Sequence, residues 1–172
     1  MRKPARTGLT TLLMTVAALA AAAPARAAPG QTATVSATVV KPLTIQWVQD
    51  LDLGTIVLGN GAWSGATVGI SRTGAFSCTN ANVTCSGATR VATYNVSGTN
   101  NQVVRVTAPN VTLVNQSDPT KSLTLVVDSP GTVALTNSGN PGVDFSLGGS
   151  ISLSSTTAGG VYAGTFNVTV DY

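Results

Sequence analysis

The stretch VYAGTFNVTVDY, residues 161–172, alternates between two kinds of side chain along its whole length. One set of alternate positions is apolar, aromatic or glycine: Tyr162, Gly164, Phe166, Val168, Val170 and Tyr172. The other set is small or polar. Because successive side chains of a β-strand point to opposite faces, this pattern predicts a closing strand with one buried face. Gly159 and Gly160 supply the bend that precedes it.

The same period of two runs through residues 32–47. The odd positions are mostly apolar: Ala33, Val35, Ala37, Val39, Leu43, Ile45 and Trp47. Pro42 has no backbone N–H to give to a sheet, so we expect a break beside it. The pattern therefore predicts a leading strand over 32–40 and a second over 43–48, with Trp47 in the core.

Further short apolar runs follow, separated by polar turns. They cover residues 51–58 with a kink at Gly54, then 66–70, 91–96, 102–107, 111–114, 122–127, 133–135 and 145–153. No helical period accompanies them. About ten short strands at this spacing predict an all-β fold, an antiparallel immunoglobulin-like β-sandwich.

The first residues have a different composition. Arg2, Lys3 and Arg6 precede an apolar run over 9–23, and Ala25-Arg-Ala27 matches a signal-peptidase site. A membrane anchor would need about 20 apolar residues, and Pro24 ends this run too early. We therefore expect residues 1–27 to be a cleavable secretion signal and 28–172 to be a single β-sandwich domain. The protein would leave through the inner membrane for the periplasm, the cell surface or the exterior.

Removal of this signal changes the charge of the chain. The precursor carries a formal net charge of +3, whereas the predicted mature chain keeps five basic residues against six aspartates. Nucleic-acid binding requires a basic surface, and five scattered cations do not provide one. We therefore expect no nucleic-acid partner, and no transmembrane segment once the signal is removed.

Cys78 and Cys85 are the two cysteines of the chain. In an exported protein two cysteines are expected to pair. Their spacing is not the C-x-x-C of redox or zinc sites, and the chain has no histidine to complete a metal site. The segment 76–87 reads as a turn-rich loop, and a bridge across it would stabilise the fold by about 2.5 kcal/mol on the chain-entropy model.

The side chains needed for catalysis are scarce. The chain contains no histidine, and all six of its acidic residues are aspartates. General acid–base and nucleophilic catalysis draw mainly on His, Glu, Lys and Cys. Asp50 and Asp52 could share a strand face and hold a cation, but two solvated carboxylates before a strand are the simpler interpretation. We expect no enzyme activity, no metal and no cofactor. Trp63, in a turn-like segment, is balanced between rim packing and ligand contact.

Three segments carry a resemblance to a known family. They are ATVSATVVKPLTI at 33–45, LDLGTI at 51–56 and the closing stretch 161–172. Together they resemble the bacterial domain-of-unknown-function family four-four-zero-two, small exported all-β proteins, over nearly the whole mature chain. More loosely, the pattern is similar to spore-coat-U-like and other chaperone–usher pilus subunits. Gly159 matches a glycine of many such pilins, whereas Tyr172 stands one place beyond their penultimate tyrosine.

The pilin resemblance implies a structural subunit of a bacterial surface or pilus-like fibre, assembled by β-strand addition. A sheet that lacks a strand exposes backbone groups, and a neighbour's alternating segment can fill the gap. Residues 28–40 are then a candidate donor extension with Ala33, Val35, Ala37 and Val39 pointing inward. The partners would be copies of the chain and a periplasmic chaperone and usher.

An alternative to the donor strand and the fibre stays open at this point. Residues 32–40 can instead be an ordinary first strand of their own sheet. In that case the protein is a monomeric secreted or surface-associated sandwich whose loops bind a carbohydrate or a protein.

Overall fold

The computed structural model describes residues 30–136 and 141–172. Within these ranges the chain forms only β-strands, all paired antiparallel, and contains one disulfide. The predicted all-β class and the cystine are thus confirmed. The predicted signal, 1–27, lies outside the described residues.

Thirteen strands lie in the described ranges, most of them at positions that the alternation predicts. They are β1 (Thr44–Gln49), β2 (Thr55–Leu58), β3 (Ala66–Ile70), β4 (Phe76–Ser77), β5 (Val83–Ser86), β6 (Ala92–Ser97), β7 (Gln102–Thr107), β8 (Val111–Asn115), β9 (Ser122–Asp128), β10 (Thr132–Leu135), β11 (Val143–Leu153), β12 (Tyr162–Ala163) and β13 (Thr169–Asp171).

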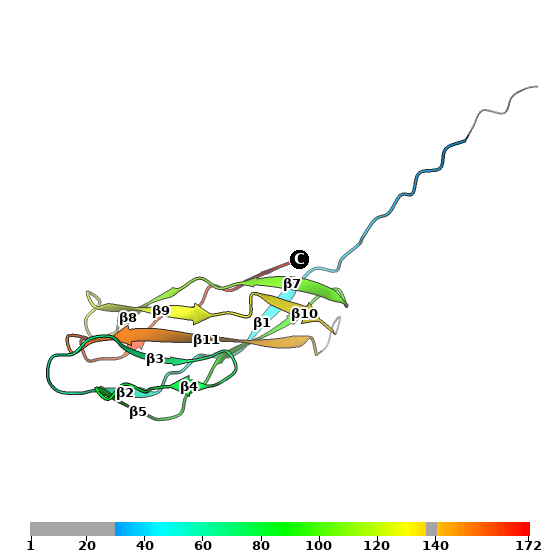
Figure 1. Ribbon diagram of the computed structural model, residues 1–172. Helices are drawn as coiled ribbons and strands as arrows, with labels where there is room; N and C mark the ends of the chain where they lie inside the picture. Colours follow the sequence, from blue (N-terminus) through cyan, green and yellow to red (C-terminus); the bar gives the residue numbers. More distant parts are fainter. Residues whose placement is uncertain (1–29, 137–140) are drawn as a thin grey trace, which may run out of the picture. The chain divides into compact units, whose positions relative to one another are not determined.

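The long strand β11 organises the largest sheet, whose order is β1-β6-β11-β9-β8-β12. Its first half, Val143 to Leu147, pairs with β6, and its second half pairs with β3 and β9. Figure 1 shows β11 in orange with β3 and β9 on either side of its second half. Gly148 and Gly149 mark the change of partners, and a Cβ at Gly148 would collide with the backbone of Ile70 and Arg72.

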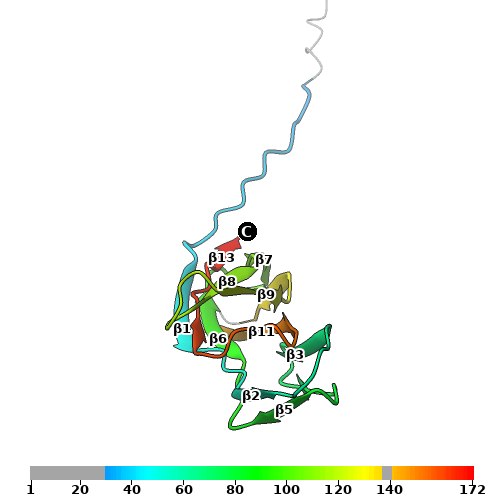
Figure 2. The same ribbon diagram turned by 90° about the vertical axis from the view of Figure 1, so that its left-hand side faces the viewer.

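Two smaller sheets complete the fold. One has the order β10-β7-β13 and the other is the pair β2-β5. Figures 1 and 2 show β2 and β5 as a layer separate from β3 and β11.

Each smaller sheet covers one half of the large sheet and encloses its own core. Side chains of β6 and β11 meet those of β7 and β10 in the first cluster, which includes Val96, Val104, Leu135 and Leu147. The second cluster contains Val68, Val83, Leu125 and Ile151, from β3, β5, β9 and β11. Leu51, Val127 and Phe166 contact both clusters and join the two halves.

Three predicted elements differ from the structure. The leading strand predicted over 32–40 is absent: residues 30–42 have no strand and are exposed. A strand persists only where a neighbouring strand accepts its hydrogen bonds, and alternation alone does not supply one. The predicted loop 76–87 contains β4 and β5, and the predicted closing strand is divided into β12 and β13.

Candidate functional site

An apolar groove of about 480 Å³ lies between two segments that are distant in the sequence, 51–58 and 157–166. Its floor consists of buried side chains of the second core: Val111, Leu125, Ile151 and Leu153. Its walls carry half-buried side chains, Leu53 and Ile56 on one side and Tyr162 and Phe166 on the other. The groove is therefore a stretch of core left partly uncovered.

The first wall owes its shape to the LDLGTI stretch. Asp52 and Arg90 exchange two backbone hydrogen bonds, which anchor the segment. The Asp52 carboxylate then accepts a hydrogen bond from the N–H of Gly54 at 2.8 Å, and Gly54 has a φ of 71°. Glycine adopts this conformation without strain, so the chain bends there and β2 begins at Thr55.

The second wall is the closing segment, which passes from one sheet to another. Its first part, β12, pairs with β8 over two residues, and its last part, β13, pairs with β7 over three. Residues 164–168 between them belong to no strand. The predicted alternation holds in part: Tyr162, Phe166, Val168 and Val170 are half-buried and their odd-numbered neighbours are exposed, but Gly164 and Tyr172 of the predicted buried face are exposed as well.

Both walls end in strand edges that have no neighbour in the described part of the chain. In the first wall β2 pairs with β5 alone, and in the second wall β12 pairs with β8 alone; β13, which lies beyond the groove lining, pairs with β7 alone. Each pairing occupies one side of the strand and leaves backbone donors and acceptors on the other. The groove thus combines uncovered apolar side chains with unused edges.

A buried asparagine holds the glycine turn at one end of the second wall. The Asn115 side chain donates to the carbonyl of Gly159 at 3.0 Å and accepts from the N–H groups of Ser117 and Asp118 at 2.9 and 3.2 Å. A Cβ on Gly160 would lie 2.5 Å from the Asn115 amide nitrogen. Glycine is therefore required at this contact, and Gly159, predicted as part of the closing element, is held in place by it.

Strand β1 is also incompletely covered. Trp47 pairs with Tyr94, which pairs with Phe145, so the three rings share one face of the sheet. Phe145 is buried and stacks on Tyr94 with ring centroids 5.7 Å apart, but Trp47 is 62% exposed. The prediction that Trp47 lies in the core is therefore wrong. Its face was predicted correctly, but β1 is the edge strand of its sheet, so Trp47 has a neighbouring strand on one side alone among the described residues.

Tyr172 contacts the C-terminal end of the exposed N-terminal segment, at Lys41. Its hydroxyl donates to the carbonyl of Lys41 at 2.6 Å and accepts from the N–H of Thr99 at 2.8 Å. The Thr99 hydroxyl in turn accepts from the N–H of Lys41 at 2.6 Å. We call these three residues the Lys41 clamp. Sequence reasoning placed Tyr172 only on the closing strand, and no sequence pattern reveals a contact with a residue 131 positions away.

The four candidate donor residues lie in the exposed segment before this clamp. Val35 is 92% exposed and Val39 is 89% exposed, and Ala33 and Ala37 are exposed as well. A valine this exposed buries almost none of its apolar surface, although full burial would stabilise the protein by at least about 1.5 kcal/mol.

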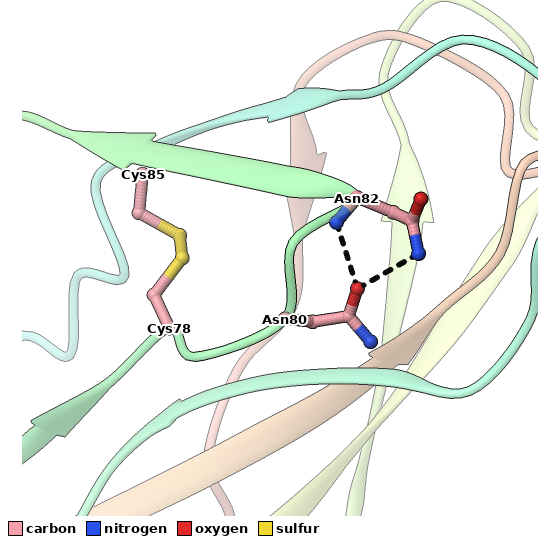
Figure 3. Close-up of a disulfide and its surroundings, with 4 residues drawn as sticks. All are labelled: Cys78, Asn80, Asn82 and Cys85. Carbon is pink, nitrogen blue, oxygen red and sulfur yellow. Dashed lines mark hydrogen bonds between the residues drawn. A yellow bond between two sulfur atoms is a disulfide. The ribbon is translucent and has the colours of Figure 1, made fainter.

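The disulfide joins two layers. Cys78 follows β4 of the large sheet, and Cys85 lies in β5, the partner of β2. Figure 3 shows the bridge and the Asn80 side chain, which accepts two hydrogen bonds from Asn82 in the loop tip. The bridge therefore fixes the sheet that carries the first wall of the groove.

The remaining candidate residues do not form a reactive cluster. Asp50 accepts a hydrogen bond from the Trp47 indole, and Trp63 packs on the rim of the second core, where its indole donates to Gly59. In the described residues no group of three or more His, Cys, Asp or Glu could hold a metal, and no helix could cross a membrane.

One family model, described as Domain of unknown function (DUF4402), matches residues 43–172. No curated protein and no solved structure matches the chain.

Proposed function

The chain belongs to the DUF4402 family of domains of unknown function, and on this premise we propose that it is an exported, non-catalytic structural subunit of a bacterial surface or pilus-like fibre. Subunits assemble by β-strand addition, in which residues 32–40 of one copy enter the groove of the next. The domain is then an immunoglobulin-like sandwich that lacks one strand.

The observation that carries this proposal is the match between the groove and the exposed segment. The groove offers uncovered apolar side chains and free strand edges. The segment offers Val35 and Val39 at alternate positions, almost fully exposed. A strand inserted between the walls gives its backbone to the edges and one row of side chains to the groove.

The energy of insertion depends on the backbone as well as on these side chains. Burying Val35 and Val39 contributes about 3 kcal/mol, and the two alanine methyls add less than about 2 kcal/mol. Ordering the nine residues 32–40 costs about 9 kcal/mol or more. Covering the groove and forming ladder hydrogen bonds at about 1 kcal/mol each must supply the rest. The free edges are therefore as important to the proposal as the groove.

Export and partners follow from the same proposal. The apolar groove is an aggregation hazard for an unassembled subunit, because open edges pair with any available strand. A periplasmic chaperone that occupies the groove until an usher exchanges it for a donor strand would remove this hazard.

The test separates donor from acceptor. A chain that begins at Lys41 lacks the donor, and the Ile56→Asp substitution puts a charge in the groove wall. Each should remain unassembled alone, and a mixture of the Lys41-start chain with full-length Ile56→Asp should form a one-to-one complex, measured by light scattering. Val57→Asp is the matched control, because Val57 lies on the same strand but is 56% exposed and lines no groove. A Lys41-start chain that is a stable monomer and binds no peptide of residues 30–40 would falsify the proposal.

A second candidate function, a monomeric binding module for a carbohydrate, is favoured by Trp47. Its exposed ring is held by a 3.0 Å hydrogen bond from the indole to Asp50, and Arg90 and Asp52 lie in the same surface hollow. On this hypothesis Trp47→Ala abolishes retention on an immobilised polysaccharide while Val103→Ala, an equally exposed apolar change outside this hollow, does not. Equal retention of both variants and the parent chain rules it out.

A further inference from the structure

Lys41, where the exposed segment joins the domain, has both its backbone N–H and its backbone carbonyl in hydrogen bonds. The N–H of Lys41 donates to the Thr99 hydroxyl, and its carbonyl accepts from the Tyr172 hydroxyl, each at 2.6 Å. The next residue, Pro42, has no N–H. The hydroxyl of Tyr172 also accepts from the Thr99 N–H, so the Lys41 clamp is closed on itself.

The free edge that is closest to residues 32–40 along the sequence belongs to their own chain. β1 begins at Thr44 and, among the described strands, pairs with β6 alone, so that its other side is open. If residues 32–40 folded back onto that side, the chain would close as a hairpin and would also cover part of its own apolar surface. Such a closed monomer would compete with assembly.

The sequence at the turn opposes that hairpin. A tight hairpin needs a turn at Lys41 and Pro42, and the favoured two-residue turns require positive φ at one or both of these positions. Proline fixes φ near −65°, and the residue before it is held in an extended conformation. Folding back would in addition break the two hydrogen bonds of Lys41.

We propose that the Lys41 clamp, together with Pro42, directs the segment 32–40 to a second copy of this chain by preventing it from pairing with its own β1. This inference rests on the proposed strand-addition function and names the partner for it. The two hydroxyls act as positioning groups for the segment and contact no part of the acceptor.

The test compares assembly across a dilution series. Tyr172→Phe removes the tyrosine hydroxyl from the clamp, and Thr99→Ala removes the threonine hydroxyl. The double change K41N/P42G places an Asn-Gly hairpin turn at residues 41 and 42. We expect the triple variant K41N/P42G/Y172F to be monomeric, with self-association weakened about tenfold or more, because the new turn favours the hairpin and the lost Tyr172 hydroxyl removes its hydrogen bonds to Lys41 and from Thr99. Thr99→Ser keeps the hydroxyl and should assemble like the parent chain.

A second measurement keeps the outcome clear if a variant is unstable. A chain closed on itself protects the amides of residues 32–40 from hydrogen exchange at concentrations where it is monomeric, and the parent chain does not. If all clamp variants assemble like the parent chain and show no such protection, the clamp has no directing role, although strand addition stands. If the Lys41-start chain binds no donor peptide, the proposed function itself fails.

Discussion

At the scale of single residues, Asn115 is the buried polar side chain of the described residues. Its three hydrogen bonds satisfy the carbonyl of Gly159 and two N–H groups of the following turn. Asn115→Ala leaves these groups without partners, so we expect a loss of about 1–3 kcal/mol in the free energy of unfolding, measured by urea denaturation. Asn110→Ala, an exposed change that removes one bond to Val127, should cost less than about 1 kcal/mol. Equal losses would show that Asn115 does not hold the turn.

Tyr94 makes the stability depend on pH in the alkaline range. Partial burial raises the pKa of its phenol, and the negative charge of Asp50 raises it further. The folded chain therefore holds this proton more tightly than the unfolded chain. The contribution of the protonated Tyr94 phenol to the free energy of unfolding is complete below the ordinary pKa of about 10. It is lost as the pH rises through the folded-state pKa. Denaturation of Tyr94→Phe at increasing pH should show a smaller alkaline loss in the free energy of unfolding. If the loss is unchanged, a group other than Tyr94 causes it.

At the scale of elements, the disulfide supports the groove wall formed by β2. Reduction, or the pair Cys78→Ala and Cys85→Ala, should lower the free energy of unfolding by about 2.5 kcal/mol. It should also weaken binding of a donor peptide, because β5 and β2 would no longer be fixed to β4. Reductant added to the double variant is the control and should change nothing. If peptide binding is not weakened, the groove wall formed by β2 does not depend on the disulfide.

Periodicity predicted the strands whose partners are close and whose faces are buried. β3 and β7 begin and end where the alternation predicts, since each is bounded by residues typical of turns. β4 and β5 were missed because they are two and four residues long and surround the cystine loop. Over 32–40 the pattern is as regular as in any strand, yet the chain supplies no partner there. Alternation reveals that a segment can pair, and the choice of partner depends on tertiary structure.

The candidate site was only partly predictable for the same reason. The closing strand and the alternating N-terminal residues were recognised from their period. The groove was not, because its floor comes from β8, β9 and β11 and its walls from segments about 100 residues apart. Trp47 shows the limit clearly, since its face was predictable but the place of its strand at the edge of the sheet was not.

At the scale of the whole molecule, a subunit with an unfilled groove should be stabilised by whatever fills it. A peptide of residues 30–40 that binds only the folded Lys41-start chain raises the free energy of unfolding by about 2.7 kcal/mol at one hundred times its dissociation constant. The predicted donor segment 28–40 carries no charge before Lys41, and the lining is largely apolar. Binding should therefore change little as salt is raised from about 0.1 to 1 M, a range over which the Debye length falls from about 10 to 3 Å.

A peptide with Val35→Asp and Val39→Asp has the same length and is the control for this experiment, and it should give no thermal shift. Ala37→Pro tests the backbone separately, because it removes one ladder donor while it keeps an apolar side chain. Since the ordering cost of the segment exceeds what its own side chains return, Ala37→Pro should weaken binding more than Val35→Ala does. If the proline peptide instead binds as well as the parent peptide, the groove is recognised through side chains alone, and strand addition is not the mode of assembly.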